Sequence, residues 1–144
     1  MCLEWLEKTI EGREKVLDFG CGSGILALCA KKLGASVVSA VDIDPQALQS
    51  TRDNAKKNGL NLEVSLPEKL RRKSFDIVVA NILANPLMHL AQTIQSHHTQ
   101  EKKIALSGIL SDQADTVQKV YSQWFTMNKI RIRDNWALLT GEKK

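Results

Sequence analysis

The chain has 144 residues, of which 43% are hydrophobic and 25% are charged, and its formal net charge is +4. Such values are typical of one globular domain, here residues 1–144, and neither a signal peptide nor an apolar run near the ~20 residues of a membrane span is present in the sequence. Three cysteines without zinc-site or disulfide spacing, and short basic groups without interleaved aromatic residues, predict a cytoplasmic protein that binds no metal, no membrane and no nucleic acid directly.

Short apolar runs alternate with helical patterns along the chain. Runs without polar alternation predict buried strands, and a shorter run predicts a weaker strand. The buried strands are expected at residues 16–20, 37–42, 75–81 and 104–107, and the weaker one at residues 61–66. Alternation of strands and helices predicts an α/β fold with a parallel sheet and helices on both faces.

Between the first strand and its helix lies a loop with Gly20, Gly22 and Gly24. Glycines there let the backbone approach a ligand, and the following helix start attracts negative charge. The spacing differs from a dinucleotide fingerprint, and no P-loop lysine follows. Asp18 would repel a pyrophosphate but suits the sulfonium and ammonium of S-adenosylmethionine. A tight turn beside an incidental carboxylate is the alternative that this loop alone leaves open.

Two carboxylates follow the second strand. An acidic residue at this position holds ribose hydroxyls in comparable folds. Asp44 stands directly before Pro45 and is expected to cap a helix, so Asp42 is the expected ribose ligand.

The helix that begins at Asp44 carries further signals. Ile43 and Leu48 have the spacing of a hydrophobic staple, in which an apolar residue before the cap packs on the first turns. Gly59 is expected to end this helix, as Gly34 ends the helix after the glycine loop, because glycine adopts the left-handed conformation that terminates helices.

The fourth strand ends at Asn81, whose carboxamide can donate and accept hydrogen bonds beside a methyl donor. Ligands of open α/β sheets lie beyond the carboxyl ends of the strands, so Gly20, Asp42 and Asn81 are expected to converge on one crevice. The pair Asn85-Pro86 predicts the next helix start.

The three histidines follow this strand: His89 falls early in the expected helix, and His97 and His98 at its far end. All three are expected to be ordinary surface or capping residues. Residues 125–141 predict two strands joined around Asp134-Asn135, an antiparallel hairpin that a dinucleotide-binding domain does not usually have.

Several stretches together resemble the catalytic domain of the PrmA family, the methyltransferases of ribosomal protein L11. The stretches are VLDFGCGSGILALCAKKLGA, VDIDPQALQSTRDNAKKNG, FDIVVANILANPL, LSGIL and NWALLTG. The resemblance implies a class I methyltransferase (Rossmann-like) fold, with a mostly parallel seven-stranded sheet and a C-terminal antiparallel hairpin. It also implies methyl transfer from S-adenosyl-L-methionine to lysine side-chain and N-terminal amines of that ribosomal protein. The residues implied in cofactor binding are Asp18, Gly20, Gly22, Asp42 and Asn81, of which Asn81 is also implied in catalysis.

The chain departs from related patterns in three ways. Ile82-Leu83-Ala84 replaces the Pro-Pro-Tyr of amino-methyltransferases, so no aromatic residue clamps the amine. The family's N-terminal recognition domain has no counterpart here, nor has its upstream His-Pro-Thr-Thr segment, so an isolated and monomeric catalytic domain is expected. A cofactor-binding fragment without turnover, or a class I methyltransferase acting on another protein or nucleic acid, stays open as an alternative.

Overall fold

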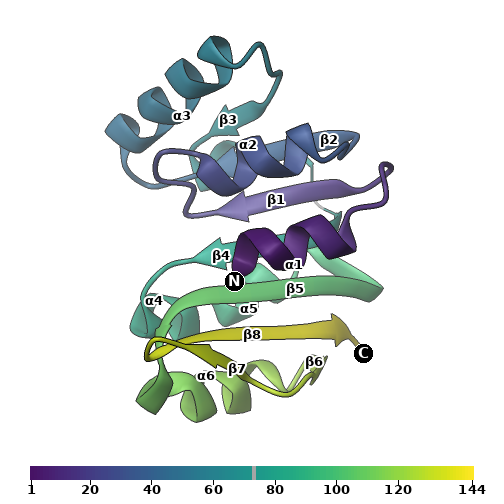
Figure 1. Ribbon diagram of the computed structural model, residues 1–144, viewed down its shortest axis with the longest axis vertical. Coiled ribbons are helices and arrows are strands. Elements are labelled where there is room, and N and C mark those ends of the chain that lie inside the picture. Colours follow the sequence, from purple (N-terminus) through teal and green to yellow (C-terminus); the bar gives the residue numbers. More distant parts are fainter. Residues whose placement is uncertain (73) are drawn as a thin grey trace.

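An eight-stranded sheet forms the centre of the computed structural model, which describes residues 1–72 and 74–144. The strands are β1 (Lys15–Phe19), β2 (Val37–Val41), β3 (Glu63–Ser65), β4 (Phe75–Asn81), β5 (His98–Leu110), β6 (Phe125–Met127), β7 (Arg131–Arg133) and β8 (Trp136–Lys143). They lie in the order β3-β2-β1-β4-β5-β8-β6, and β7 pairs with β8 (Figure 1). Seven strands therefore follow one path. The count is eight and not seven because the first strand of the expected C-terminal hairpin is divided into β6 and β7.

Parallel pairing joins β1 to β2 and β4, β2 to β3, and β4 to β5, whereas β8 is antiparallel to β5, β6 and β7. The expected C-terminal hairpin is confirmed. Asp134 and Asn135 form the β7–β8 turn, and both have positive φ angles, of 51° and 66°. Aspartate and asparagine tolerate this conformation better than most side chains, which suits a two-residue hairpin turn.

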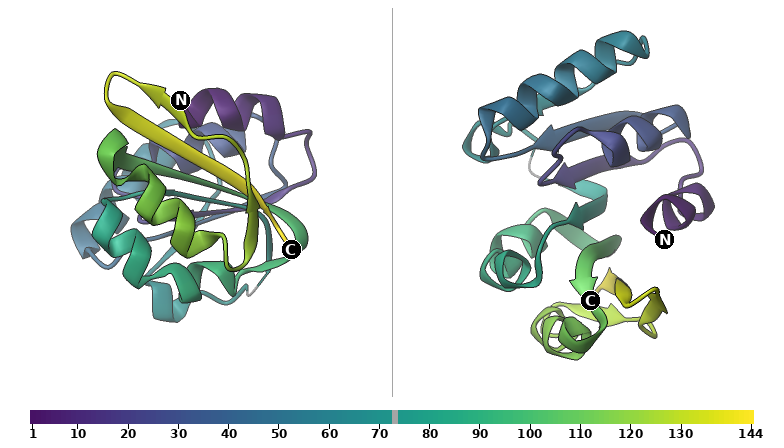
Figure 2. Two further views of the ribbon diagram at one scale, coloured as in Figure 1. Left: turned by 90° about the horizontal axis from the view of Figure 1, so that it is seen from below. Right: turned by 60° about the vertical axis from the view of Figure 1, so that its left-hand side comes forward.

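Helices cover both faces of the sheet, as expected (Figure 2). They are α1 (Cys2–Thr9), α2 (Ile25–Lys32), α3 (Pro45–Lys57), α4 (Ala84–His89), α5 (Ala91–Gln95) and α6 (Ala114–Tyr121), with short 3-10 helices η1 (Pro67–Lys69) and η2 (Ser111–Gln113). The first three pack on one face, and α4, α5 and α6 pack on the other. None of the helices within the described residues is both long and apolar enough to cross a bilayer.

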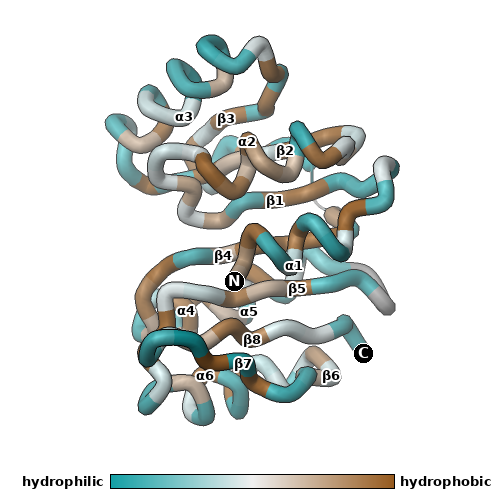
Figure 3. The backbone as a smooth tube through the Cα atoms, viewed as in Figure 1, coloured by the Kyte–Doolittle hydropathy of each residue, from teal (hydrophilic) through white to brown (hydrophobic). Residues whose placement is uncertain are grey.

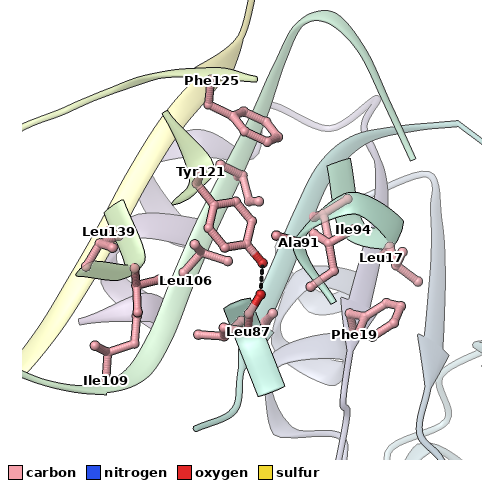
Figure 4. Close-up of a cluster of buried hydrophobic side chains, with 14 of the residues drawn as sticks. Leu17, Phe19, Leu87, Ala91, Ile94, Leu106, Ile109, Tyr121, Phe125 and Leu139 are labelled. Carbon is pink, nitrogen blue, oxygen red and sulfur yellow. Dashed lines mark hydrogen bonds between the residues drawn. The ribbon is translucent and has the colours of Figure 1, made fainter. Parts of the chain in front are cut away.

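Side chains of β1 alternate between two apolar clusters, one on each face. Leu17 and Phe19 belong to the cluster under α4, α5 and α6, and Val16 belongs to the cluster under α1, α2 and α3. In the first cluster, the hydroxyl of Tyr121 donates a hydrogen bond to the carbonyl oxygen of Leu87 at 2.8 Å (Figure 4). The outer helix α3 is mostly hydrophilic (Figure 3), so the core is built largely from the strands and the inner helix faces.

The signals for α3 are confirmed except for the staple. Asp44 caps the helix by accepting a hydrogen bond from the Gln46 amide, and Pro45 is its first residue. Gly59 follows the helix with a φ of 63°. The expected packing of Ile43 on Leu48 is wrong, because Ile43 is 83% exposed while Leu48 is buried.

Two expectations around α4 and α5 are also wrong. Helix α4 begins at Ala84, so Pro86 lies inside its first turn, where the backbone needs no N–H donor. His98 is buried at the start of β5, with its two ring nitrogens near the carbonyl oxygens of Ile94 and Lys103. Burial lowers the pKa of His98 to about 4, which keeps the ring neutral.

Candidate active site

The glycine loop turns sharply between β1 and α2. Gly20, Gly22 and Gly24 have φ angles of 85°, 54° and 86°, in the left-handed region where a side chain is strained. Gly24 is also the cap of α2. The loop therefore presents backbone, with little side-chain bulk, at the carboxyl end of β1.

Side chains from outside the loop hold it in place. The Gly22 amide donates to Oδ2 of Asp42 at 3.0 Å, and the Gly22 carbonyl oxygen accepts from the hydroxyl of Thr51 at 2.9 Å. The amide nitrogen of the Asn54 side chain donates to the carbonyl oxygen of Ser23 at 2.9 Å. Neither Thr51 nor Asn54 was predicted from the sequence. The signal for Thr51 is a threonine among the apolar residues that α3 buries, next to Leu48 and Ala55.

Asp42 lies half-buried at the end of β2, with each carboxylate oxygen bound by a backbone amide. Oδ1 accepts from the Asp44 amide at 3.0 Å, and Oδ2 accepts from Gly22. A carboxylate oxygen has two acceptor positions, so both oxygens can accept a further hydrogen bond. The arrangement fits a ligand with neighbouring hydroxyl groups.

Asp18 lies beneath the loop and is 1% exposed. Its Oδ2 accepts from the Ala27 amide at 3.1 Å, in the first turn of α2, while its Oδ1 is buried without a hydrogen-bond partner among the described residues. Burial raises the pKa of the Asp18 carboxyl to about 7; the Ala27 hydrogen bond opposes this rise, and the charge of Asp42 adds to it. A buried carboxylate oxygen without a partner favours a cationic group nearby.

A hollow of about 350 Å³ opens beside Asp42. Its lining is mostly apolar and comes from the ends of β1 and β2, from η1 and from the segment after β4: Phe19, Gly20, Asp42, Ile43, Pro67, Ile82, Leu83, Pro86 and Leu90. Ile43 is 83% exposed and Leu83 is 69% exposed. Large apolar side chains left this exposed around a hollow are typical of a site for a flat apolar ligand.

The end of β4 completes this edge of the sheet. Asn81 is exposed, and in the part of the chain that the structure describes its carboxamide makes no hydrogen bond. The adjacent Ile82 packs on the glycine loop: its Cγ2 lies 2.5 Å from where a β-carbon at Gly20 would stand. The structure thus brings Gly20, Asp42 and Asn81 to one edge, while their roles toward a ligand stay predictions. Within residues 1–72 and 74–144, no group of three metal-ligating side chains is present.

The sheet order, with parallel strands followed by an antiparallel hairpin, defines the class I methyltransferase fold. A T. thermophilus 16S rRNA methyltransferase (RsmC), solved in complex with AdoMet and guanosine, has this fold: its TM-score to the chain is 0.80 at 20% identity, over 99% of this chain and 42% of that one.

The chain belongs to the family described as ribosomal protein L11 methyltransferase (PrmA), whose family model matches residues 1–144. Relatives bearing the name ribosomal protein L11 methyltransferase include those of Chromobacterium violaceum, 46% identical over 144 residues, and Laribacter hongkongensis, 48% identical over 145 residues. The crystal structure of the ribosomal protein L11 methylase from Lactobacillus delbrueckii subsp. bulgaricus has a TM-score of 0.92 at 30% identity, over 99% of this chain and 77% of that one. All of this chain matches the two relatives, but it spans only about half of their length, 48% and 49%.

Proposed function

We propose that residues 1–144 form the catalytic domain of an S-adenosyl-L-methionine-dependent protein methyltransferase. Its substrate would be ribosomal protein L11, methylated on lysine side-chain and N-terminal amines. The observation that carries the proposal is the crevice in which the glycine loop, Asp42 and the end of β4 meet, in a chain of this family. A monomeric chain located in the cytoplasm, without direct contact to nucleic acid, belongs to the same proposal.

The residues present fit this cofactor. Asp42 would accept hydrogen bonds from the ribose hydroxyls, and the apolar hollow with Ile43 would hold the adenine ring. Gly22, where nothing lies within 4 Å of an added β-carbon, leaves room for the amino-acid part along the loop, and the unpartnered oxygen of Asp18 supplies negative charge beneath it. The cofactor, when bound, supplies a methyl group that is already activated by its sulfonium.

The chain's own contribution to the reaction is orientation and exclusion of water. The end of β4 would hold the acceptor amine in line with the methyl group that the cofactor supplies, and the proton that the amine loses would pass to water. Holding reactants in such a geometry can lower a barrier by ~7–11 kcal/mol. A lysine amine has a pKa of ~10.4, so desolvation at the crevice would favour its neutral form. Asn81 stands beside the acceptor in this proposal, and the exposed Leu83 allows a broad range of amines.

The first test is calorimetric titration of the chain with S-adenosylmethionine, repeated on Asp42→Ala. The variant should bind about tenfold more weakly or worse, because a hydrogen bond to a charged group is worth ~1.5–3 kcal/mol. Asp53→Ala is the matched control, since it removes an exposed carboxylate of α3 that accepts a hydrogen bond from the Gln49 side chain. Absence of binding by a folded wild-type chain, or preferential binding of a dinucleotide, would contradict the proposal.

The second test measures methyl transfer to purified ribosomal protein L11 by mass spectrometry. Mass increments of a methyl group on its amines support the substrate assignment. Cofactor binding without any increment would show a binding unit without turnover, and methylation of ribosomal RNA instead would place the substrate in another class.

A further inference from the structure

A β-bulge lies directly opposite the end of β4. In the β5–β8 pairing, Leu106 is opposite Leu139 and Ile109 is opposite Ala137, so β5 carries one extra residue between the two pairs. Within the bulge, Gly108 has a φ of 81°. Bulges with a left-handed glycine often re-aim backbone beside functional sites.

Gly108 contacts the two acceptor groups at the end of β4. A β-carbon on Gly108 would stand 2.6 Å from the carbonyl oxygen of Ile82 and 2.9 Å from Oδ1 of Asn81. Both distances are shorter than real β-carbons show, and the atoms that would be struck belong to the backbone and to a short side chain. The missing side chain therefore lets two carbonyl-type oxygens lie together against β5.

The same segment is held from the other side by Gly20. Strand β4 lies between β1 and β5 (Figure 1), and the side chain of Ile82 occupies the space that a β-carbon at Gly20 would fill. Ile82 is thus fixed by its side chain against β1 and by its carbonyl against β5. A β-carbon at Gly108 would therefore press on the backbone of Ile82 as well as on the side chain of Asn81.

We infer that Gly108 is a positioning residue for the acceptor amine: it sets where the oxygens of Asn81 and Ile82 stand. This inference rests on the proposed function, because these two oxygens would accept hydrogen bonds from the N–H groups of the acceptor amine. Displacement of a reacting group by about 1 Å can slow an enzyme by up to about 100-fold. Gly108→Ala should therefore lower kcat by about 10- to 100-fold. Cofactor affinity should fall by a much smaller factor, because Ile82 is only one of the nine residues that line the hollow beside Asp42.

Two other glycines provide matched controls. A β-carbon on Gly141 would stand 2.8 Å from the carbonyl oxygen of Thr126, between β8 and β6, so Gly141→Ala introduces similar crowding outside the crevice. Gly59 has a φ of 63° with nothing within 4 Å of an added β-carbon, so Gly59→Ala introduces backbone strain alone. Neither control should change kcat once the loss of folded protein is accounted for.

The experiment measures both the position of the Asn81 side chain and the rate of methyl transfer in each variant. In nitrogen-15 NMR spectra, the side-chain amide of Asn81 should shift in Gly108→Ala and keep its position in both controls. Turnover on the ribosomal protein and calorimetric binding of S-adenosylhomocysteine are measured on the same samples. An unmoved Asn81 signal, or a kcat loss equal to that of Gly141→Ala, would overturn the inference.

The wild-type chain supplies a measurement that needs no variant. A nuclear Overhauser contact between the Gly108 α-protons and the Asn81 amide protons is expected, and its absence would overturn the inference even if Gly108→Ala does not fold. A wild-type chain that transfers no methyl group would instead contradict the proposed function. In that case the NMR signals still decide whether Gly108 positions Asn81.

Discussion

The hydroxyl of Thr51 donates a hydrogen bond to the carbonyl oxygen of Gly22, across 29 positions in the sequence. The same hydroxyl lies 3.4 Å from the thiol sulfur of Cys21, and a β-carbon on Gly24 would stand 2.8 Å from the Thr51 methyl group. One buried side chain of α3 therefore lies against three residues of the glycine loop: Cys21, Gly22 and Gly24. The shape of the loop depends on a helix that follows the next strand.

Replacing this threonine tests that dependence. Thr51→Val keeps the volume but leaves the Gly22 carbonyl without its donor, which should destabilise the fold by ~1–3 kcal/mol. Because the loop loses its anchor, affinity for S-adenosylmethionine should fall several-fold in calorimetric titration. Thr9→Val is the control, since Thr9 donates to the Trp5 carbonyl within α1, away from the loop. Equal affinities in the two variants would show that Thr51 serves stability alone.

Asp18 predicts an unusual dependence of stability on pH. Its pKa is raised from 3.8 to about 7 in the folded chain, so between about pH 4 and pH 7 the unfolded chain ionises first. The free energy of unfolding should therefore fall as pH rises through this window and level off above it. A shift of this size corresponds to on the order of 4 kcal/mol as an upper bound.

Denaturant unfolding at several pH values, on wild type and Asp18→Asn, measures this effect. The variant keeps an acceptor for the Ala27 amide but has no proton to lose, so it should lack this pH-dependent loss and be the more stable protein above about pH 7. Its affinity for the cationic cofactor should nevertheless be lower. Parallel pH profiles of the two proteins would show that Asp18 is ionised throughout.

Replacing Ile43 should weaken cofactor binding without changing the stability of the fold. The side chain is 83% exposed, so Ile43→Ser should change the free energy of unfolding by no more than about 0.5 kcal/mol. The hollow would lose apolar lining, and cofactor affinity should fall about three- to tenfold, in line with about 0.8 kcal/mol per buried methylene. Ile132→Ser is matched to it, because Ile132 is 58% exposed on β7. Similar affinities in both variants would place the adenine ring elsewhere.

The sequence predicted those parts of the fold that depend on local signals. The start of α3 at Asp44 and Pro45 and its end near Gly59 were confirmed, because a cap and a terminating glycine act on their own few residues. The expected parallel sheet and its C-terminal hairpin were confirmed for a similar reason. Each buried strand is visible as a short apolar run, and the hairpin turn is visible as the pair Asp134-Asn135. The division of the first hairpin strand into β6 and β7 was missed, because the two pieces are three residues long each and the break between them depends on their separate pairing with β8.

The failures concern contacts between distant segments. The spacing of Ile43 and Leu48 fits a staple, but it carries no information about the hollow that β1 and β4 build beside Ile43. His98 has polar neighbours in the sequence, yet it is buried by the pairing of β5 with β4 and by an edge-to-face contact with the Phe125 ring. The position of Gly108 beside Asn81 depends on the bulge in β5. A bulge is a change of register between two strands, and the spacing of apolar residues along one strand does not reveal it.

The place of β8 in the sheet has a consequence for how the chain is made. Among strands β1 to β8, β8 (residues 136–143) is synthesised after all of its partners, yet it lies between β5 and β6 and also pairs with β7. The four strands β3, β2, β1 and β4 have their partners much earlier and can assemble while translation continues. Strands β6 and β7 join the sheet only through β8. Until β8 is synthesised, β5 therefore has an unpaired edge that other unfolded chains can reach. Until β8 has emerged, this edge of β5 is therefore the part of the sheet most open to pairing with the wrong strand.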